Sequence, residues 1–240
     1  MKPTFSPIGD QGISITFGHT ISLETHAKVK ACYYHLIEDQ LENIIEVVPS
    51  YHSVAVYFDW RVITYETMKS KLEEKLQQVP KTVPSANKRV VLPVCYEKVL
   101  APDLARVAKT NYLSEQDVIK KHTNVVYTVY MIGFLPGFPY VGGLDETIAT
   151  ERLEEPRGNV EAGSVGIAGS QTGVYPIDSP GGWNIIGKTP INLFQANAEQ
   201  PSLFSIGDQL QFQAVSLTDF HMIESKVKSG VYQLKTEEVR

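Results

Sequence analysis

The residues that could bind a ligand or do chemistry are concentrated in one glycine- and proline-rich stretch of the sequence, residues 133–190. This stretch contains 12 of the 17 glycines and 6 of the 14 prolines, although the chain as a whole has an ordinary content of both. Glycine allows tight turns and close approach of the backbone to a ligand, and proline stiffens the loops between them. We therefore expect the ligand-facing surface of the chain in this stretch.

The first part of the stretch interleaves aromatic rings with glycines and prolines. Phe134, Pro136 and Phe138 lie in the run GFLPGFPY at 133–140. Such a loop is stiff and presents rings that could bind a planar or apolar ligand, or a peptide that contains proline. Alternatively, the rings cover the core and simply pack against it. The residues alone leave both interpretations open.

The second part, residues 156–190, holds only four charged side chains, and Arg157 is the one best suited to a ligand. Its planar guanidinium can clamp a carboxylate or a phosphate. Gln171 and Asn184 could orient an amide. An ion pair between Arg157 and Asp178 is the competing interpretation and needs no ligand. The remaining candidates for ligand or partner contact are Ser179, Pro180, Gly182 and Trp183 of the run SPGGW.

The sequence assigns no catalytic residue and no metal site. All six histidines lie outside residues 133–190, and no HExxH, CxxC or His/Cys cluster occurs. The members of a Ser-His-Asp triad need not be close in sequence, but the G-x-S-x-G elbow that would present its serine is absent. We therefore expect neither a bound metal nor an autonomous triad.

One stretch, from Gly182 to Thr189, matches the phosphate-binding P-loop pattern G-x-x-x-x-G-K-[ST]. A working P-loop needs a buried strand before it and a helix after it, so that backbone N–H groups surround the phosphate. The residues before Gly182 read PIDSPG, and two prolines oppose a central strand. The apolar residues inside the match predict a β-hairpin instead, so we interpret the match as a coincidence.

Length and composition set wider limits. The 240 residues are 42% hydrophobic and 20% charged, which allows a substantial core and argues against disorder. A net charge of -5 predicts no basic surface for nucleic acid, and no apolar run is long enough to span a membrane. Cys32 and Cys95 have no disulfide or metal-binding spacing, so we expect a reducing, cytoplasmic location.

The elements that must position the glycine-rich stretch fall into two domains. The first 95 residues follow the order β-α-β-β-α-β, the split βαβ order of ferredoxin-like domains, with 89–95 as its last strand, and we expect the N-terminal domain to be residues 1–87. The segment 80–87 is polar, contains two prolines and is the expected linker. Residues 88–240 are mostly strand-like and predict a closed barrel, with Asp103 as a candidate helix cap. The strand pattern at 89–95 fits either domain.

Several long motifs resemble the allophanate hydrolase subunit 1 family, a carboxyltransferase subdomain that is also found fused inside urea amidolyases. The matching runs are GFLPGFPY at 133–140, PR at 156–157, AGSVGIAG at 162–169, QTGVYP at 171–176 and SPGGW at 179–183. Gly9-Asp10 and Phe17-Gly18 also look like the opening of the family, so the resemblance covers nearly the whole chain. The family usually shows arginine where Lys188 stands, which further weakens the P-loop interpretation.

The resemblance implies an α+β protein with an N-terminal α/β domain and a C-terminal cyclophilin-like β-barrel domain. It implies a non-autonomous subunit of a complex that opens 5-oxoproline to L-glutamate, beside a KipA-like and a LamB/YcsF-like subunit. ATP is consumed by that complex, and no cofactor is implied on this chain. A second implied activity is non-enzymatic: binding the dimerisation domain of a sensor histidine kinase and inhibiting its autophosphorylation in sporulation control.

Two alternatives stay open beside this assignment. The chain could serve an allophanate or urea amidolyase-type hydrolase, or it could regulate by protein binding alone without an enzymatic role. A cyclophilin-like groove binds proline-containing peptides, and a five-membered lactam has the shape of proline. Our hypothesis is one concave site for either ligand, lined by Phe134, Phe138, Arg157, Gln171 and Trp183.

Overall fold

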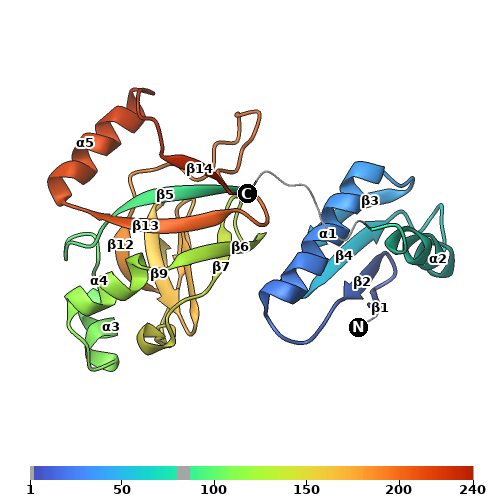
Figure 1. The fold of residues 1–240 in the computed structure, drawn as a ribbon, viewed down its shortest axis with the longest axis horizontal. Coiled ribbons are helices and arrows are strands. Elements are labelled where there is room, and N and C mark those ends of the chain that lie inside the picture. The colour runs from blue at the N-terminus through green and yellow to red at the C-terminus, as the bar shows by residue number, and fades with distance from the viewer. Residues whose placement is uncertain (1–2, 80–86, 240) are drawn as a thin grey trace. The chain divides into compact units, whose positions relative to one another are not determined.

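The computed structural model describes residues 3–79 and 87–239 and divides the chain into two compact units, Met1–Ser85 and Ala86–Arg240 (Figure 1). Of the predicted linker at 80–87, only Asn87 lies within the described residues, where it begins the first strand of the second unit.

The first unit is a four-stranded antiparallel sheet with two helices. One face of the sheet is fully buried at Ile13, Ile15, Val54, Val56 and Phe58, and the helices contribute Val29, Leu36, Met68 and Leu72 to the same core. Both helices begin at a side-chain cap: the Ser22 hydroxyl accepts a hydrogen bond from the backbone N–H of Thr25, and Thr64 does the same for Thr67. The elements are β1 (Thr4–Ile8), β2 (Gly12–Thr16), α1 (Leu23–Asp39), β3 (Ile44–Pro49), β4 (Ser53–Phe58) and α2 (Tyr65–Leu76), with strand order β1-β2-β4-β3.

The predicted β-α-β-β-α order is present in this unit, but a complete ferredoxin-like domain is not confirmed. The expected last strand, β5 (Asn87–Cys95), pairs with strands of the second unit. Its place beside β2 is taken by β1, which the sequence pattern did not predict. Pro7 lies within β1 and weakens the strand pattern, and an edge strand is where a sheet tolerates proline.

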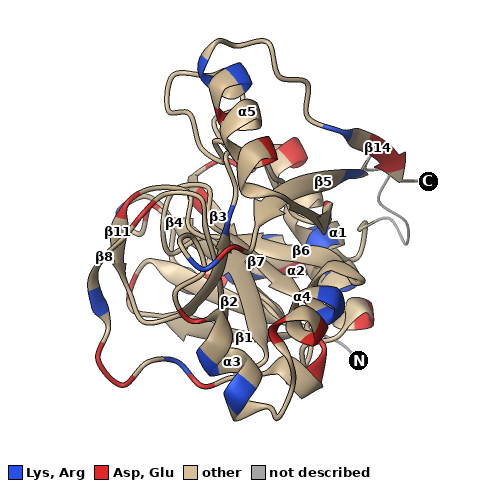
Figure 2. Ribbon diagram, turned by 90° about the vertical axis from the view of Figure 1, so that its left-hand side faces the viewer, with Lys and Arg blue, Asp and Glu red and all other residues tan. Residues whose placement is uncertain are grey.

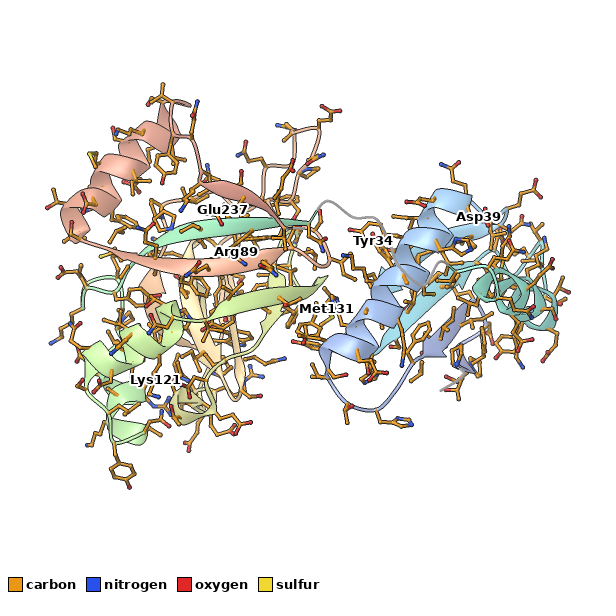
Figure 3. All side chains as sticks on the ribbon, viewed as in Figure 1. Tyr34, Asp39, Arg89, Lys121, Met131 and Glu237 are labelled. Carbon is orange, nitrogen blue, oxygen red and sulfur yellow. The ribbon has the colours of Figure 1, made fainter. Side chains whose placement is uncertain are left out.

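The second unit is a closed barrel in the order β12-β9-β10-β7-β6-β13-β5, with β12 pairing back to β5. β5 runs parallel to β13 over seven residue pairs, and β14 adds to its other side, where Arg89 and Glu237 form an ion pair (Figure 3). The further bounds are α3 (Leu104–Thr110), α4 (Glu115–Thr123), β6 (Val126–Ile132), β7 (Pro139–Gly142), the 3-10 helix η1 (Glu146–Ile148), β8 (Arg157–Val160), β9 (Ser164–Ala168), β10 (Gln171–Val174), β11 (Ser179–Gly181), β12 (Asn184–Lys188), β13 (Gln209–Val215), α5 (Leu217–Lys228) and β14 (Thr236–Val239).

A chain of polar groups crosses the apolar core of the barrel. Tyr96 Oη lies 2.8 Å from His122 Nδ1, and His122 Nε2 lies 2.9 Å from Thr172 Oγ1. The Thr172 hydroxyl donates to the Gly166 carbonyl, so Nε2 must carry the imidazole proton and Nδ1 accepts from Tyr96. Burial lowers the pKa of His122 to about 3, so the imidazole is neutral and acts as a structural link.

Candidate functional site

Five aromatic rings of the glycine-rich stretch meet on the barrel unit around Phe138. The Phe138 ring lies 5.7 Å from Phe134, 5.0 Å from Tyr140, 5.6 Å from Tyr175 and 5.5 Å from Trp183, measured between centroids. Phe138 is 1% exposed, whereas Phe134 is 67% exposed. We call these five rings the aromatic cluster. The predicted packing role is confirmed for Phe138, which forms core, whereas Phe134 presents an uncovered apolar face and its role in ligand binding stays a prediction.

The loop that carries Phe134 is a tight turn. The backbone N–H of Gly133 donates to the Phe138 carbonyl at 3.1 Å, and the N–H of Phe138 donates to Leu135 at 3.0 Å. Phe134 itself has a left-handed backbone with φ of 68°, which is uncommon for a non-glycine residue. Pro136 lies at the exposed tip of this turn. The turn holds the Phe134 ring against the edge of Phe138 while most of the ring stays exposed.

Two glycines allow the rings to approach the strands. A Cβ atom on Gly173 of β10 would lie 3.0 Å from Phe138 Cζ and 3.2 Å from Trp183 Cζ3. A Cβ atom on Gly181 would collide with the Tyr175 hydroxyl. Gln171 is half-buried two residues before Gly173, and alternate residues of a strand share a face. Gln171 is therefore on the face of β10 that bears the cluster.

Arg157 lies beside the cluster, but its charge is already paired. Its Nη2 donates to Asp103 Oδ1 at 2.7 Å, and its Nη1 donates to the Trp183 carbonyl at 3.3 Å. The other oxygen of Asp103 accepts from the Ile185 backbone N–H at 2.6 Å. The competing prediction, an ion pair between Arg157 and Asp178, is wrong, because Arg157 pairs with Asp103 and Asp178 accepts from the Ala162 N–H instead. Asp103 does occupy the N-cap position of α3, as predicted, but its side chain makes no cap bond to that helix.

Asn184, predicted as a residue that could orient a ligand amide, is fully buried and fully used by the fold. Its Nδ2 donates to the carbonyls of Glu151 and Ile167, each at 3.0 Å. Its Oδ1 accepts from Arg106. These bonds fix the segment around Glu151 to β12, so Asn184 acts as a positioning residue for the backbone.

The remaining predicted residues lie on or next to a ribbon of two strands, β8 and β11 (Figure 2). Ser179 is 7% exposed, and its hydroxyl has no hydrogen-bond partner among the described residues. Pro180 is exposed, whereas Gly182 is buried and its carbonyl accepts from the Leu153 N–H at 2.7 Å. A Cβ atom on Gly182 would lie 3.1 Å from Arg152 Nη2.

Three residues of this surface are absent from the sequence prediction: Arg152, Tyr140 and Tyr175. Both tyrosines stand inside motifs that mark the glycine-rich stretch, so their position was the available signal. Burial raises the pKa of Tyr140 and of Tyr175, which keeps both hydroxyls protonated. For Arg152, a charged residue in a loop, no pattern in the sequence offered a signal.

The P-loop match does not form a P-loop. The strand β12 continues through Lys188, which pairs with Glu161, and the next segment is not a helix. The predicted hairpin is also wrong, because β12 pairs with β9 and β5 rather than with residues 190–194. Lys188 and Thr189 instead line a separate pocket of about 140 Å³ against α5, which shares no residue with the aromatic cluster.

Metal-binding and membrane-spanning features are both missing from the part of the chain that the structure describes. No group of three or more His, Cys, Asp and Glu side chains there could hold a metal ion. None of the helices there is both long and apolar enough to cross a membrane.

The fold and the cluster together define a β-barrel protein with an aromatic, glycine-rich surface. The chain belongs to the family of the carboxyltransferase domain, subdomains C and D, which matches residues 3–204. It is 41% identical over 225 residues to the 5-oxoprolinase B-subunit of Bacillus subtilis, covering 89% of this chain and 93% of the relative.

Other relatives include one that the chain covers over its full length and longer proteins that it covers only in part. A conserved uncharacterized protein of Pyrococcus horikoshii is 40% identical, with a TM-score of 0.54, and covers 90% of this chain and 100% of its own. The chain spans only 40% of another solved relative, which is 31% identical with a TM-score of 0.77. Urea amidolyase of Saccharomyces cerevisiae is 24% identical over 266 residues, an alignment that covers 98% of this chain but 14% of the yeast protein.

Proposed function

We propose that this chain is the B-subunit of a 5-oxoprolinase, a complex that opens the lactam of 5-oxoproline to L-glutamate at the expense of ATP. Similarity to the Bacillus subtilis 5-oxoprolinase B-subunit over nearly the full length of both chains carries this proposal. The complex contains two further subunits, one KipA-like and one LamB/YcsF-like, and works in the cytoplasm. The barrel is of the cyclophilin-like type.

In this proposal the chain binds the substrate and a partner supplies the general base. The only ion pair at the aromatic cluster, among the described residues, is the Arg157–Asp103 pair, and both side chains are committed to it. His122 lies inside the barrel with its two ring nitrogens bonded, and burial holds its pKa at about 3. A five-membered lactam offers an apolar ring face, for which Phe134 and Trp183 are suitable contacts.

The test is reconstitution of the three subunits. The full chain is co-expressed with the two partner subunits, and L-glutamate formed from 5-oxoproline and ATP is measured. We expect glutamate only when all three chains and ATP are present. The same mixture with urea or allophanate addresses the amidolyase alternative. Glutamate formation without this chain, or hydrolysis of allophanate in preference to 5-oxoproline, contradicts the proposal.

We also propose the second function, inhibition of a sensor histidine kinase, on one observation: Phe134 is 67% exposed and held in a left-handed turn beside Phe138. Exposed aromatic anchors of this kind dominate many protein interfaces. The full chain should reduce autophosphorylation of the kinase, measured with radiolabelled ATP, and Phe134→Ala should weaken that inhibition at least tenfold. Tyr112→Ala, an exposed aromatic on the helical side of the unit, is the control. Absence of inhibition by the wild-type chain overturns this function without touching the enzymatic one, and equal inhibition by both variants overturns the role of Phe134.

A further inference from the structure

We propose that Arg152, rather than Arg157, binds the carboxylate of the substrate at the aromatic cluster. This inference rests on the proposed function, because it assigns a residue to the carboxylate of 5-oxoproline. It concerns recognition of the substrate and leaves the hydrolytic chemistry to the complex.

Arg157 is unsuited to this role because its guanidinium already has a buried partner. Asp103, which is 7% exposed, receives the Arg157 Nη2 bond on one oxygen and the Ile185 N–H on the other. A substrate carboxylate would have to displace Asp103 and leave a buried charge unpaired, which is strongly unfavourable. Arg157 therefore holds β8 and β12 together and does not act as an anion clamp.

Arg152 is fixed in place through its neighbours in the chain. The Glu151 carbonyl accepts from the buried Asn184 side chain at 3.0 Å, and the Leu153 N–H donates to the Gly182 carbonyl at 2.7 Å. The backbone on both sides of Arg152 is thus tied to the segment that carries Trp183. The position of Arg152 is defined although the residue lies in a loop.

The guanidinium of Arg152 lies over the glycine that precedes Trp183. Its Nη2 and Nε lie 3.1 and 3.4 Å from the place that a Cβ atom of Gly182 would take. The positive charge is also close enough to Tyr175 to lower the pKa of that hydroxyl, against the larger effect of burial. Arg152 therefore borders the cluster at Trp183 and Tyr175.

The charge of Arg152 is available to a ligand. Arg152 is exposed, and among the described residues its guanidinium forms no hydrogen bond and no ion pair, although Glu151, Glu154 and Glu155 lie nearby in the sequence. An exposed guanidinium next to aromatic rings suits a small ring that bears a carboxylate: the two oxygens face the planar donors and the ring faces Trp183.

The experiment compares Arg152→Gln and Arg152→Lys in the reconstituted three-subunit complex. We expect KM for 5-oxoproline to rise about 10- to 100-fold in Arg152→Gln, with a smaller rise in Arg152→Lys, which keeps the charge but loses the planar fork. The inhibition constant of 5-oxoprolinamide, the same lactam without the carboxylate, should stay unchanged. Arg61→Gln, which removes an exposed arginine of the first unit, is the control and should leave KM unchanged.

The outcomes separate the two proposals. If the wild-type complex forms no glutamate from 5-oxoproline, the proposed function fails and this inference fails with it. If the wild-type complex is active but KM is unchanged in Arg152→Gln, or the inhibition constant of the amide rises as much as KM does, Arg152 does not bind the carboxylate and only this inference is overturned.

Discussion

The guanidinium of Arg157 and the carboxylate of Asp103 meet at 2.7 Å across 54 residues of sequence. Asp103 is buried, and its second oxygen binds the Ile185 N–H at the start of β12. The pair thus joins the segment before α3, the ribbon strand β8 and the barrel strand β12. Arg157, which the sequence suggests as a ligand clamp, is therefore a structural residue beside the aromatic cluster.

We expect Arg157→Ala to destabilise the chain by about 2 kcal/mol, because Asp103 would remain buried without its cation. The free energy of unfolding is measured by urea titration. Adding Asp103→Asn to this variant should restore part of the loss, since the second substitution removes the unpaired charge. An additive loss in the double variant contradicts a coupled pair.

The glycine on β10 offers a test of the ring packing. Gly173→Ala would place a methyl group 3.0 Å from Phe138 Cζ and 3.2 Å from Trp183 Cζ3, so the rings must shift. We expect a loss of about 1–3 kcal/mol, as for other overpacked sites, together with altered Trp fluorescence. Gly158→Ala in β8 is the matched control, because a Cβ atom there meets nothing within 4 Å. Equal stability of the two variants would show that Gly173 is not required for close packing.

The sequence predicted where the aromatic cluster lies along the chain better than which distant residues pair with one another. The density of glycine and proline at 133–190 and the aromatic motif at 133–140 are local signals, and both mark the surface. The partner of Arg157 and the destination of β5 depend on pairing between distant segments, which a local pattern does not contain. For Asp103, the nearest helix was the only partner visible along the chain, which is why the sequence favoured a cap.

The first unit shows the same division between local and distant information. The cap of α1 at Ser22 depends only on residues three positions apart, so it is a local feature of the sequence. Whether the strand after α2 returns to the same sheet is decided by seven paired residues of β13, more than a hundred positions later. Apart from β1, the order of helices and strands was therefore predictable in this unit, whereas sheet membership was not.

His122 should make the stability of the barrel depend on pH. Its pKa is about 3 in the folded chain and about 6.5 when unfolded, so the unfolded state binds the extra proton between these values. The contribution of His122 to the free energy of unfolding is therefore fully present above pH 6.5. It falls as the pH decreases toward 3, by up to about 1.4 kcal/mol per pH unit. The free energy of unfolding is measured from pH 7 to pH 4.5.

Replacing His122 by glutamine isolates this contribution. The variant loses some stability at pH 7, because an amide fills the space between Tyr96 and Thr172 less well, but its stability should depend less on pH. His221→Gln, an exposed histidine of α5, is the control and should keep the wild-type slope. An unchanged slope in His122→Gln contradicts the neutral, buried assignment.

The buried hydroxyl of Ser179 leads to the last prediction. It has no hydrogen-bond partner among the described residues, and an unsatisfied buried hydroxyl costs about 1–3 kcal/mol. Ser179→Ala should therefore leave the free energy of unfolding unchanged or raise it by about 1 kcal/mol. By contrast, Ser216→Ala removes the hydroxyl that caps α5 and should lower it by about 1 kcal/mol. A loss of stability in Ser179→Ala similar to that in Ser216→Ala would mean that Ser179 has a partner.

If Ser179→Ala is stable but KM for 5-oxoproline rises in the reconstituted complex, the hydroxyl is retained at a cost to the fold because it serves the ligand.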